Sequence, residues 1–196
     1  MLYFLLQTFM SDLQKPIFLI GMPAVGKSTL GKQIAQKYSL QFIDMDKYIE
    51  KIQGKSISEI FSEKGEAFFR QIEAESLKEL TKTQNTVIAT GGGTPCFYDN
   101  MSLMLERGKV VFLDFPLEQI SNRIGHNSQS RPMFVGKTST QIASKIQELY
   151  THRRLYYQKA HYTVQNEEIL WDTIAKILKK QEKPYKNCKA FLKPKL

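Results

Sequence analysis

The segment from Gly21 to Ser28 matches the pattern G-x-x-x-x-G-K-[ST] of a phosphate-binding loop. Its glycines leave the backbone unobstructed, so that several N–H groups can converge on phosphate oxygens, and a helix after the loop adds its positive end. Lys27 supplies a point charge beside the phosphates, and the hydroxyl of Ser28 is a ligand for Mg²⁺, which prefers oxygen. The motif predicts a site for ATP and Mg²⁺. Its expected nucleotide-binding residues are Ala24, Val25, Gly26, Lys27, Ser28 and Thr29.

Two carboxylates lie two residues apart in Phe42-Ile43-Asp44-Met45-Asp46, at the end of a predicted strand. Because side chains alternate along a strand, we expect Asp44 and Asp46 to point the same way and Met45 to oppose them. Ligands of open parallel sheets bind beyond the carboxyl ends of the strands, so one Asp can reach the hydrated metal while the other bonds an acceptor hydroxyl. Capping of the next helix by Asp46 is the alternative interpretation.

Three consecutive glycines, Gly91, Gly92 and Gly93, follow another apolar run. Glycine gives up local stability in return for close backbone approach and freedom at positive φ. A tight structural turn usually needs only one or two glycines. The triplet therefore predicts that a ligand or another chain segment lies against this backbone.

Two predicted helices carry arginines that could bind an anion. Arg70 and Glu73 are three residues apart, so the carboxylate can orient the guanidinium, although an exposed ion pair is an equal alternative. Arg153 and Arg154 are neighbours on a later helix, and at 100° per residue they cannot both face one cleft. The three histidines show no metal-ligand spacing, and we expect His152 and the other two to be incidental.

The stretch from Gly125 to Thr138 is rich in Gly, Asn, Ser and Gln and is long for a connection in a compact domain. We expect it to be a lid. Arg123 and Arg131 flank or enter it, where a guanidinium group could close on phosphates and stabilise transferring charge. Solvated loop arginines are the ordinary alternative.

Five short apolar runs alternate with segments of helical period, which predicts a parallel sheet with helices on both faces. The predicted strands are residues 17–20, 41–43, 86–89, 109–113 and 162–164. Between the second and third strands, Ser56 and Glu59 have the spacing of a capping box that opens a short helix, and Gly65 can close it. Longer helices are predicted over residues 66–80, 139–159 and 168–180.

The net charge of +9 resides mostly at the C-terminal end. From residue 176 to 196 there are eight lysines against one glutamate, a local charge of +7 that leaves only +2 for residues 1–175. Such a run is ordinarily a solvated tail, so the charge alone does not indicate a nucleic-acid or membrane partner.

The 196 residues suit a single domain, which we place over residues 15–180, with an extension over 1–14 and a basic tail over 181–196. The apolar run near the N-terminus lacks the features of a signal peptide and is far shorter than a bilayer span. Cys96 and Cys188 form no disulfide framework and no metal motif. We therefore expect a cytoplasmic protein.

The assembled motifs resemble the shikimate kinase family. The features that carry the resemblance, in chain order, are the phosphate loop with Ser28, Asp44-x-Asp46, Gly65-Glu66-x-x-Phe69-Arg70-x-x-Glu73, the glycine triplet and Arg131-Pro132. The likeness covers about residues 17–175. It implies a three-layer α/β/α fold of the P-loop kinase type, with a five-stranded parallel sheet, a lid over about 125–138 and substrate-binding helices over about 45–80.

The resemblance also implies a reaction, transfer of the γ-phosphoryl of MgATP to the 3-hydroxyl of shikimate in aromatic amino acid biosynthesis. Asp46 would bind the acceptor hydroxyl, and Asp44 would order the magnesium waters beside Ser28. Lys27 and Arg131 would neutralise the transferring charge. The expected ATP-binding set adds Arg123 and Arg131, and the expected shikimate-binding residues are Asp46, Arg70, Gly91, Gly92, Gly93 and Arg153.

The late helix departs from the family pattern, because it lacks the usual proline and its register admits either His152 or Arg153. We choose Arg153, since losing a carboxylate-binding arginine would be costly. Gluconate kinase is the nearest alternative, adenylate kinase usually has Gly after the loop lysine, and a nucleic-acid-linked ATPase could use the basic tail. We expect a monomer with a small-molecule substrate and no nucleic-acid or membrane partner.

Overall fold

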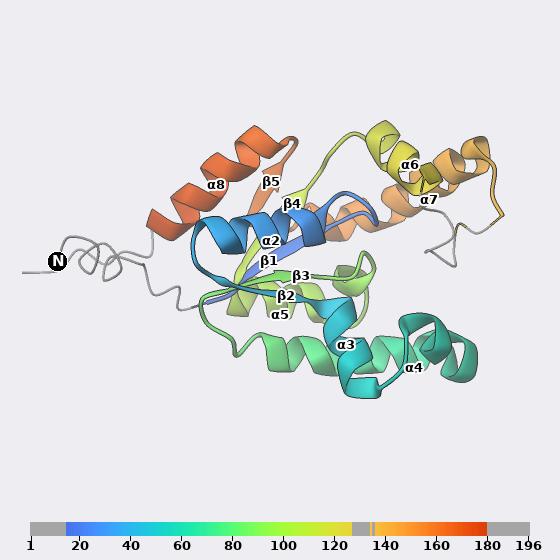
Figure 1. Cartoon of the computed structure of the whole chain (residues 1–196), viewed down its shortest axis with the longest axis horizontal. Coiled ribbons are helices and arrows are strands. Elements are labelled where there is room, and N and C mark those ends of the chain that lie inside the picture. The colour runs from blue at the N-terminus through green and yellow to red at the C-terminus, as the bar shows by residue number, and fades with distance from the viewer. Residues whose placement is uncertain (1–14, 127–133, 135, 180–196) are drawn as a thin grey trace, which may run out of the picture.

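Five parallel strands form one sheet in the order β2-β3-β1-β4-β5 (Figure 1). The computed structural model describes residues 15–126, 134 and 136–179. The strands are β1 Ile17–Gly21, β2 Gln41–Asp44, β3 Thr86–Ala89, β4 Lys109–Leu113 and β5 Tyr162–Val164. In the register of the sheet, Leu19 aligns with Ala89 on one side and with Val111 on the other. The predicted five-stranded parallel sheet is confirmed.

Helices cover both faces of the sheet. They are α2 Lys27–Lys37, α3 Met45–Gln53, α4 Ile57–Leu80, α5 Asn100–Arg107, α6 Leu117–His126, α7 Ser139–Tyr157 and α8 Glu167–Lys179, with the short 3₁₀ turn η1 at Thr94–Cys96. Helices α2 and α8 lie on one face, and α5 with α4 beside it lies on the other (Figure 1). The predicted three-layer α/β/α arrangement is therefore confirmed.

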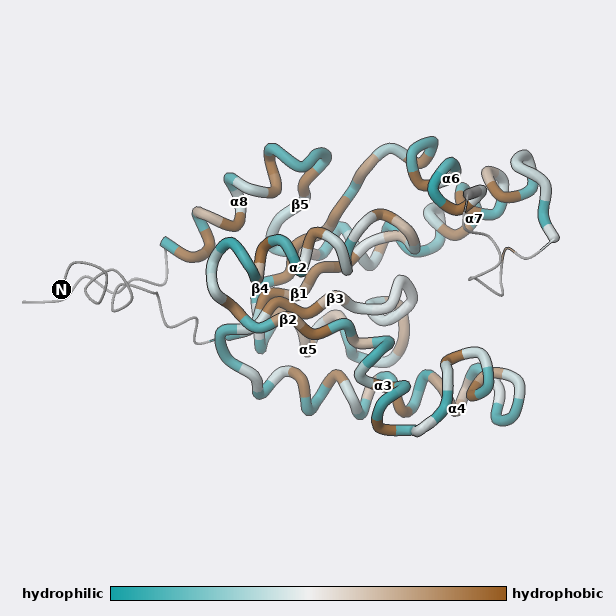
Figure 2. The backbone as a smooth tube through the Cα atoms, viewed as in Figure 1, coloured by the Kyte–Doolittle hydropathy of each residue, from teal (hydrophilic) through white to brown (hydrophobic). Residues whose placement is uncertain are grey.

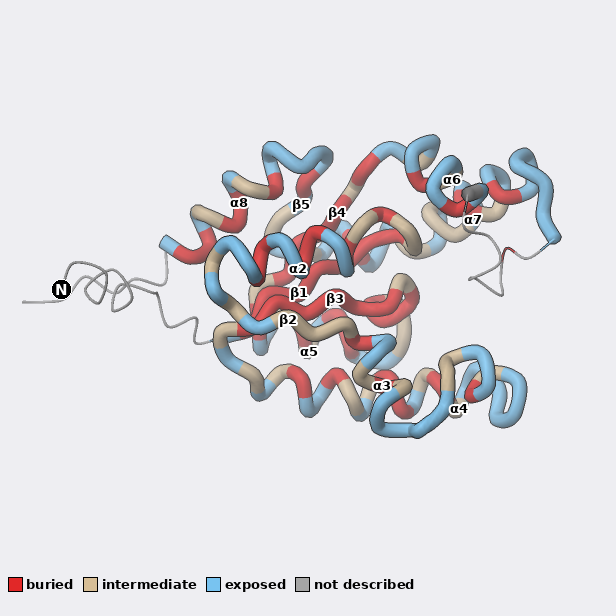
Figure 3. Tube along the Cα trace, viewed as in Figure 1, coloured by how far each residue is buried: buried red, intermediate tan, exposed pale blue. Residues whose placement is uncertain are grey.

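The centre of the sheet is the core of the molecule. Strands β1 and β3 are buried over their whole length, and β4 is buried from Val110 onward (Figures 2 and 3). A central strand of a parallel sheet has helices on both faces, so it is a continuous apolar run rather than an alternating one. Burying each large apolar side chain contributes about 1.5–3 kcal/mol, which makes this centre a rigid base for the loops that leave it.

The segment between β2 and β3 follows the predicted local signals. The Oγ of Ser56 accepts a hydrogen bond from the backbone N–H of Glu59, whose carboxylate accepts one from the backbone N–H of Ser56 at 2.7 Å. Gly65 has φ 77° and ψ 176°, which breaks α4 between its short first part and its longer second part. The capping box and the break at Gly65 are both confirmed, and they orient the longer part, which carries Arg70.

The predicted lid is described only at its edges. Gly125 and His126 end α6 rather than open a loop, because the buried Ile120 and Ile124 continue the helical period to that point. At the other end, the side chain of Thr138 caps α7. Arg131, the extension over 1–14 and the tail over 181–196 lie outside the described residues. In the part of the chain that is described, no helix is long and apolar enough to cross a membrane.

Candidate active site

The phosphate-binding loop joins β1 to α2 at the carboxyl edge of the sheet. Gly21 and Gly26 have φ of 142° and 112°, values that L side chains rarely adopt, and a Cβ on Gly21 would lie 2.8 Å from the carbonyl oxygen of Leu113. Gly26 is the N-cap of α2 and supplies no side-chain acceptor, and the first turn of α2 has no acidic residue. No acidic side chain of the first turn occupies the positive end of this helix, which fits the phosphates of a nucleotide.

Two basic side chains brace this loop. The buried Nζ of Lys27 donates to the carbonyl oxygens of Gly21 at 2.9 Å and Met22 at 2.8 Å. From α6, Nη1 of Arg123 donates to the carbonyl oxygen of Val25 at 2.9 Å. Both positive charges thus lie at the loop where phosphate charge would accumulate. The sequence placed Arg123 beside a lid as an expected ATP-binding residue, and the structure places it directly on the phosphate-binding loop.

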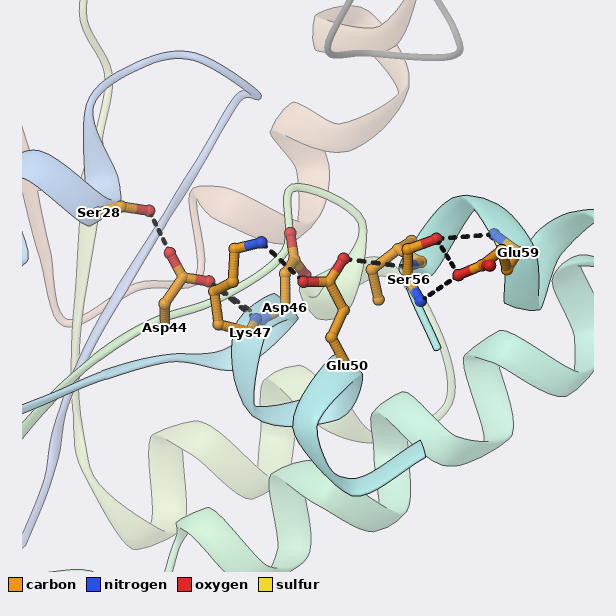
Figure 4. A network of polar contacts seen from close by, with 8 residues as sticks. Ser28, Asp44, Asp46, Lys47, Glu50, Ser56 and Glu59 are labelled. Carbon is orange, nitrogen blue, oxygen red and sulfur yellow. Dashed lines mark hydrogen bonds and ion pairs between the residues drawn. The ribbon is translucent and has the colours of Figure 1, made fainter. Parts of the chain in front are cut away.

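The two aspartates meet at one edge of the site, but for a different reason from the predicted one. Strand β2 ends at Asp44, and Asp46 lies in the first turn of α3, so strand alternation does not align them. Asp44 caps α3 by accepting from the backbone N–H groups of Asp46 and Lys47, while its other carboxylate oxygen accepts from the Oγ of Ser28 at 2.5 Å (Figure 4). Capping by Asp44 is what draws the two carboxylates together.

Asp46 lies in an electrostatic environment that disfavours its charge. Loss of hydration between the walls of the site, followed by the negative charges of Asp44 and Glu73, raises its pKa from 3.8 to about 6, while the positive charge of Lys27 lowers it. The residue nevertheless keeps a large exposed surface, because it faces an open cavity. A carboxyl group with a pKa near neutrality is suited to exchange a proton with a substrate hydroxyl.

The triple-glycine turn, Gly91–Gly93, follows β3 and faces three functional side chains. A Cβ added at Gly91, Gly92 or Gly93 would lie 2.9 Å from Oε1 of Glu73, 3.1 Å from Nη1 of Arg153 and 2.9 Å from Nη1 of Arg70, respectively. The predicted close approach is confirmed. The predicted use of positive φ is wrong, since none of the three has φ in that region. Glycine is needed here for space alone.

Arg70 is held rigidly beside this turn. Its Nη1 donates to Glu73 at 2.8 Å and its Nη2 to Glu66 at 3.0 Å, and its guanidinium lies 4.1 Å from the centre of the Phe97 ring. Glu73 is only 1% exposed and also accepts from the Oγ1 of Thr94 at 2.5 Å. The Arg70–Glu73 pair is therefore a buried support and not the exposed surface pair considered as its alternative. Thr94 is a residue of the site whose contact the sequence did not indicate.

The structure shows which of three neighbouring residues on α7 faces the site. Arg153 is half-buried and reaches the triple-glycine turn, whereas His152 and Arg154 are exposed, with Arg154 over the ring of Tyr150 at 5.8 Å. Arg153 follows the buried Ile146 by seven positions and precedes the buried Tyr157 by four, so all three lie on one face of the helix. This spacing of apolar residues in the sequence could have predicted that Arg153 lies on the buried face of α7.

One cavity of about 620 Å³ connects the phosphate-binding loop with the two aspartates. Its lining includes the phosphate-binding loop, both aspartates, Gly92 of the triple-glycine turn and Arg123, and it adds Gln33 of α2 and Glu167 of α8, which the sequence did not indicate. Within the described residues no cluster of three or more His, Cys, Asp or Glu side chains forms a metal site. The hydroxyl of Ser28 beside Asp44 fits a largely hydrated Mg²⁺, which needs few protein ligands.

A phosphate-binding loop that shares one cavity with two carboxylates at the edge of a parallel sheet is the arrangement of a P-loop kinase, which brings a nucleotide and an acceptor together. The family model described as shikimate kinase matches residues 23–182. The chain belongs to the shikimate kinase family.

Two bacterial shikimate kinases match the sequence of this chain along nearly their whole length. The chain is 39% identical over 168 residues to the shikimate kinase of Bacteroides thetaiotaomicron, covering 85% of this chain and 96% of that protein. It is 41% identical over 171 residues to the shikimate kinase of Alkaliphilus oremlandii, covering 83% and 99%.

Solved structures show the same fold. The crystal structure of the Bacteroides thetaiotaomicron shikimate kinase superposes with a TM-score of 0.77 at 36% identity, covering 86% of this chain and 98% of that one. The shikimate kinase from Acinetobacter baumannii in complex with shikimate gives a TM-score of 0.79 at 30% identity, covering 90% and 99%.

Proposed function

We propose that this chain transfers the γ-phosphoryl group of MgATP to the 3-hydroxyl of shikimate, giving shikimate 3-phosphate and ADP in the route to chorismate and the aromatic amino acids. The convergence of Arg70 and Arg153 on the triple-glycine turn, whose Gly92 lines the same cavity as the phosphate-binding loop, supports this conclusion. Two planar guanidinium groups beside an unobstructed backbone suit a small carboxylate that also carries hydroxyls.

In this proposal the acceptor lies between the two arginines and Asp46. Arg70, fixed by Glu73 and Glu66, and Arg153 bind the shikimate carboxylate, and Gly91, Gly92 and Gly93 leave room for the ring. Asp46 accepts a hydrogen bond from the 3-hydroxyl. As the hydroxyl oxygen bonds to the γ-phosphorus and the bond to ADP breaks, the hydroxyl proton passes to Asp46.

The nucleotide is held from the other side of the cavity. The loop residues Ala24, Val25, Gly26, Lys27, Ser28 and Thr29 bind its phosphates, with Arg123 and Arg131 as further cationic groups. Ser28 would hold Mg²⁺, and Asp44 would do so through water. When bound, Mg²⁺ supplies charge neutralisation at the β- and γ-phosphates. Positioning and neutralisation are most of what phosphoryl transfer requires of the protein.

The proposed organisation of the enzyme is a single domain over residues 15–180 that works as a monomer in the cytoplasm. The near-neutral charge of residues 1–175 and the concentration of lysines from residue 176 onward support a small-molecule substrate over nucleic acid.

A coupled ADP-release assay with shikimate, gluconate and AMP offered separately tests the function. We expect MgATP turnover with shikimate and background rates with the other two. ADP formation with gluconate or AMP but not shikimate would overturn the substrate while leaving the kinase class intact.

Neighbouring arginines on α7 provide a matched test of the carboxylate site. We expect Arg153→Ala to raise the KM for shikimate about 10- to 100-fold, because a hydrogen bond between charged groups contributes about 1.5–3 kcal/mol. Arg154→Ala removes the same charge from an exposed position and should leave this KM within about twofold of the unmodified enzyme. Steady-state kinetics at saturating MgATP measures both. Equal effects of the two substitutions would refute the assignment.

The pKa of Asp46 sets an acidic limit to activity. Since the deprotonated form accepts the hydroxyl proton and its pKa is about 6, we expect kcat/KM for shikimate to fall about tenfold per pH unit below about pH 6 and to be flat above about pH 7. Rates from pH 5 to 8, with the melting temperature recorded at each pH, measure this dependence. A profile that stays flat to pH 5 would contradict it.

A further inference from the structure

Tyr157, the last residue of α7, is a buried polar side chain to which the reaction described above gives no role. It is 0% exposed, and its ring packs against Phe112 with the ring centres 5.0 Å apart. Its hydroxyl donates to the carbonyl oxygen of Gly92 at 2.5 Å, a contact that joins residues 65 positions apart. The same hydroxyl lies close to Arg153, one turn earlier on the helix.

This hydrogen bond fixes more than one atom. A trans peptide unit is planar, so its C=O and N–H point in opposite directions, and the described chain has no cis peptide bond. Holding the carbonyl oxygen of Gly92 toward α7 therefore directs the N–H of Gly93 away from α7. Glycine has no side chain with which to hold its own peptide plane, so an external donor is the means of fixing it.

The donor is present at every working pH. Burial raises the pKa of Tyr157 far above its ordinary value, so the hydroxyl keeps its proton. Gly92 also lines the same cavity as Asp46 and Lys27, and Arg153 lies within van der Waals distance of a Cβ placed on Gly92. Tyr157 thus lies directly behind both the triple-glycine turn and one of the two proposed carboxylate-binding arginines.

We propose that Tyr157 is a positioning residue for the acceptor substrate, whose hydroxyl fixes the peptide plane of the triple-glycine turn and the position of Arg153 without touching the substrate. The inference rests on the proposed phosphorylation of shikimate. It assigns to Tyr157 an effect on acceptor binding alone, since the hydroxyl contacts no residue of the phosphate-binding loop among its described hydrogen bonds.

Tyr157→Phe keeps the ring and its packing on Phe112 but removes the donor. We expect the KM for shikimate to rise about tenfold, as for loss of one well-placed hydrogen bond, with the KM for ATP within about twofold. Tyr150→Phe is the matched control, because it removes a hydroxyl on the same helix that donates to Asp114 at 2.8 Å, away from the cavity. It should change neither KM.

The division between KM and kcat separates positioning from a merely structural role. A partly unfolded variant has fewer active molecules, so its apparent kcat falls while both KM values stay unchanged. An unchanged KM for shikimate in Tyr157→Phe, or an equal rise in both KM values, would overturn the proposal. If the unmodified enzyme instead turned over MgATP with another acceptor and not with shikimate, the proposed function would fail, and that result is independent of any variant.

Discussion

Lys27→Met is expected to lower kcat by about 10³-fold, since it removes a cation from the place where charge on the transferring phosphoryl accumulates. In the folded protein Nζ of Lys27 is already held against the carbonyl oxygens of Gly21 and Met22, so it is positioned before the nucleotide binds. Methionine keeps much of the stem and removes only the ammonium group. The coupled ADP-release assay at saturating MgATP and shikimate measures the loss.

Two controls accompany this prediction, the stability of the Lys27→Met variant and the activity of a variant at another lysine of α2. Losing the two hydrogen bonds of the Lys27 ammonium should cost about 1–2 kcal/mol in the free energy of unfolding, a fall of several degrees in the melting temperature, so the variant remains folded at the assay temperature. Lys32→Met alters an exposed lysine on the same helix, outside the cavity, and should keep the normal kcat. Retention of kcat within tenfold by Lys27→Met would contradict the role of this lysine.

The phosphate-binding loop could be predicted from the sequence because everything that defines it is local. A buried strand, a loop with glycines at its two ends and a helix start follow one another within 11 residues of Ile17, and the structure places each of them as expected. The same holds for the capping box at Ser56 and for the helix break at Gly65. Each depends on backbone preferences of neighbouring residues, which a single sequence displays.

The predicted proximity of Asp44 and Asp46 is correct, but the predicted reason for it is wrong. Alternation along a strand and capping of a helix both predict that two carboxylates spaced by one residue lie together. The structure selects capping, but by Asp44 and not by Asp46 as the alternative had it, because Asp44 ends β2 and its carboxylate accepts from two N–H groups of α3. The competition between the two local patterns is settled by where the strand stops, and that depends on its pairing with β3.

Contacts between distant segments could not be predicted from one sequence. Thr94 supports Glu73 across 21 positions, and Tyr157 holds Gly92 across 65. These pairs meet only once the sheet has brought the ends of β3, α4 and α7 to one edge. The orientation of Arg153 toward the site could be predicted in part. It follows from the buried face of α7, which the spacing of Ile142, Ile146 and Tyr157 displays in the sequence.

Asp46→Asn should change activity and stability in opposite directions. The amide keeps the size of the side chain and can still accept a hydrogen bond from the 3-hydroxyl, but it cannot take the proton. We therefore expect kcat to fall about 10²- to 10⁴-fold, with only a small change in the KM for shikimate. The coupled assay at pH 8 measures both constants. Normal kcat in Asp46→Asn would refute the acceptor role of this carboxylate.

The stability effect follows from the raised pKa of the same group. Folding disfavours the charged form of Asp46, whose pKa is about 6 in the folded protein against 3.8 ordinarily, so the ionised carboxylate opposes folding above pH 6. As the pH falls through 6 and then below 3.8, the group becomes protonated first in the folded and then in the unfolded state, and the opposition disappears. Because the carboxyl faces an open cavity and is partly screened by water, we expect Asn to add only about 1 kcal/mol to the free energy of unfolding at pH 8.

Melting temperatures at pH 8 and pH 4 test whether Asp46→Asn stabilises the protein, with Asp172→Asn on the exposed face of α8 as the control. Asp46→Asn should melt a few degrees above the unmodified protein at pH 8 and within about one degree of it at pH 4, whereas Asp172→Asn should alter neither kcat nor the melting temperature. A residue kept only for structure would lose stability together with activity when its charge is removed. A carboxylate that is retained for proton transfer and whose charge opposes folding should instead gain stability and lose turnover when it is replaced by an amide.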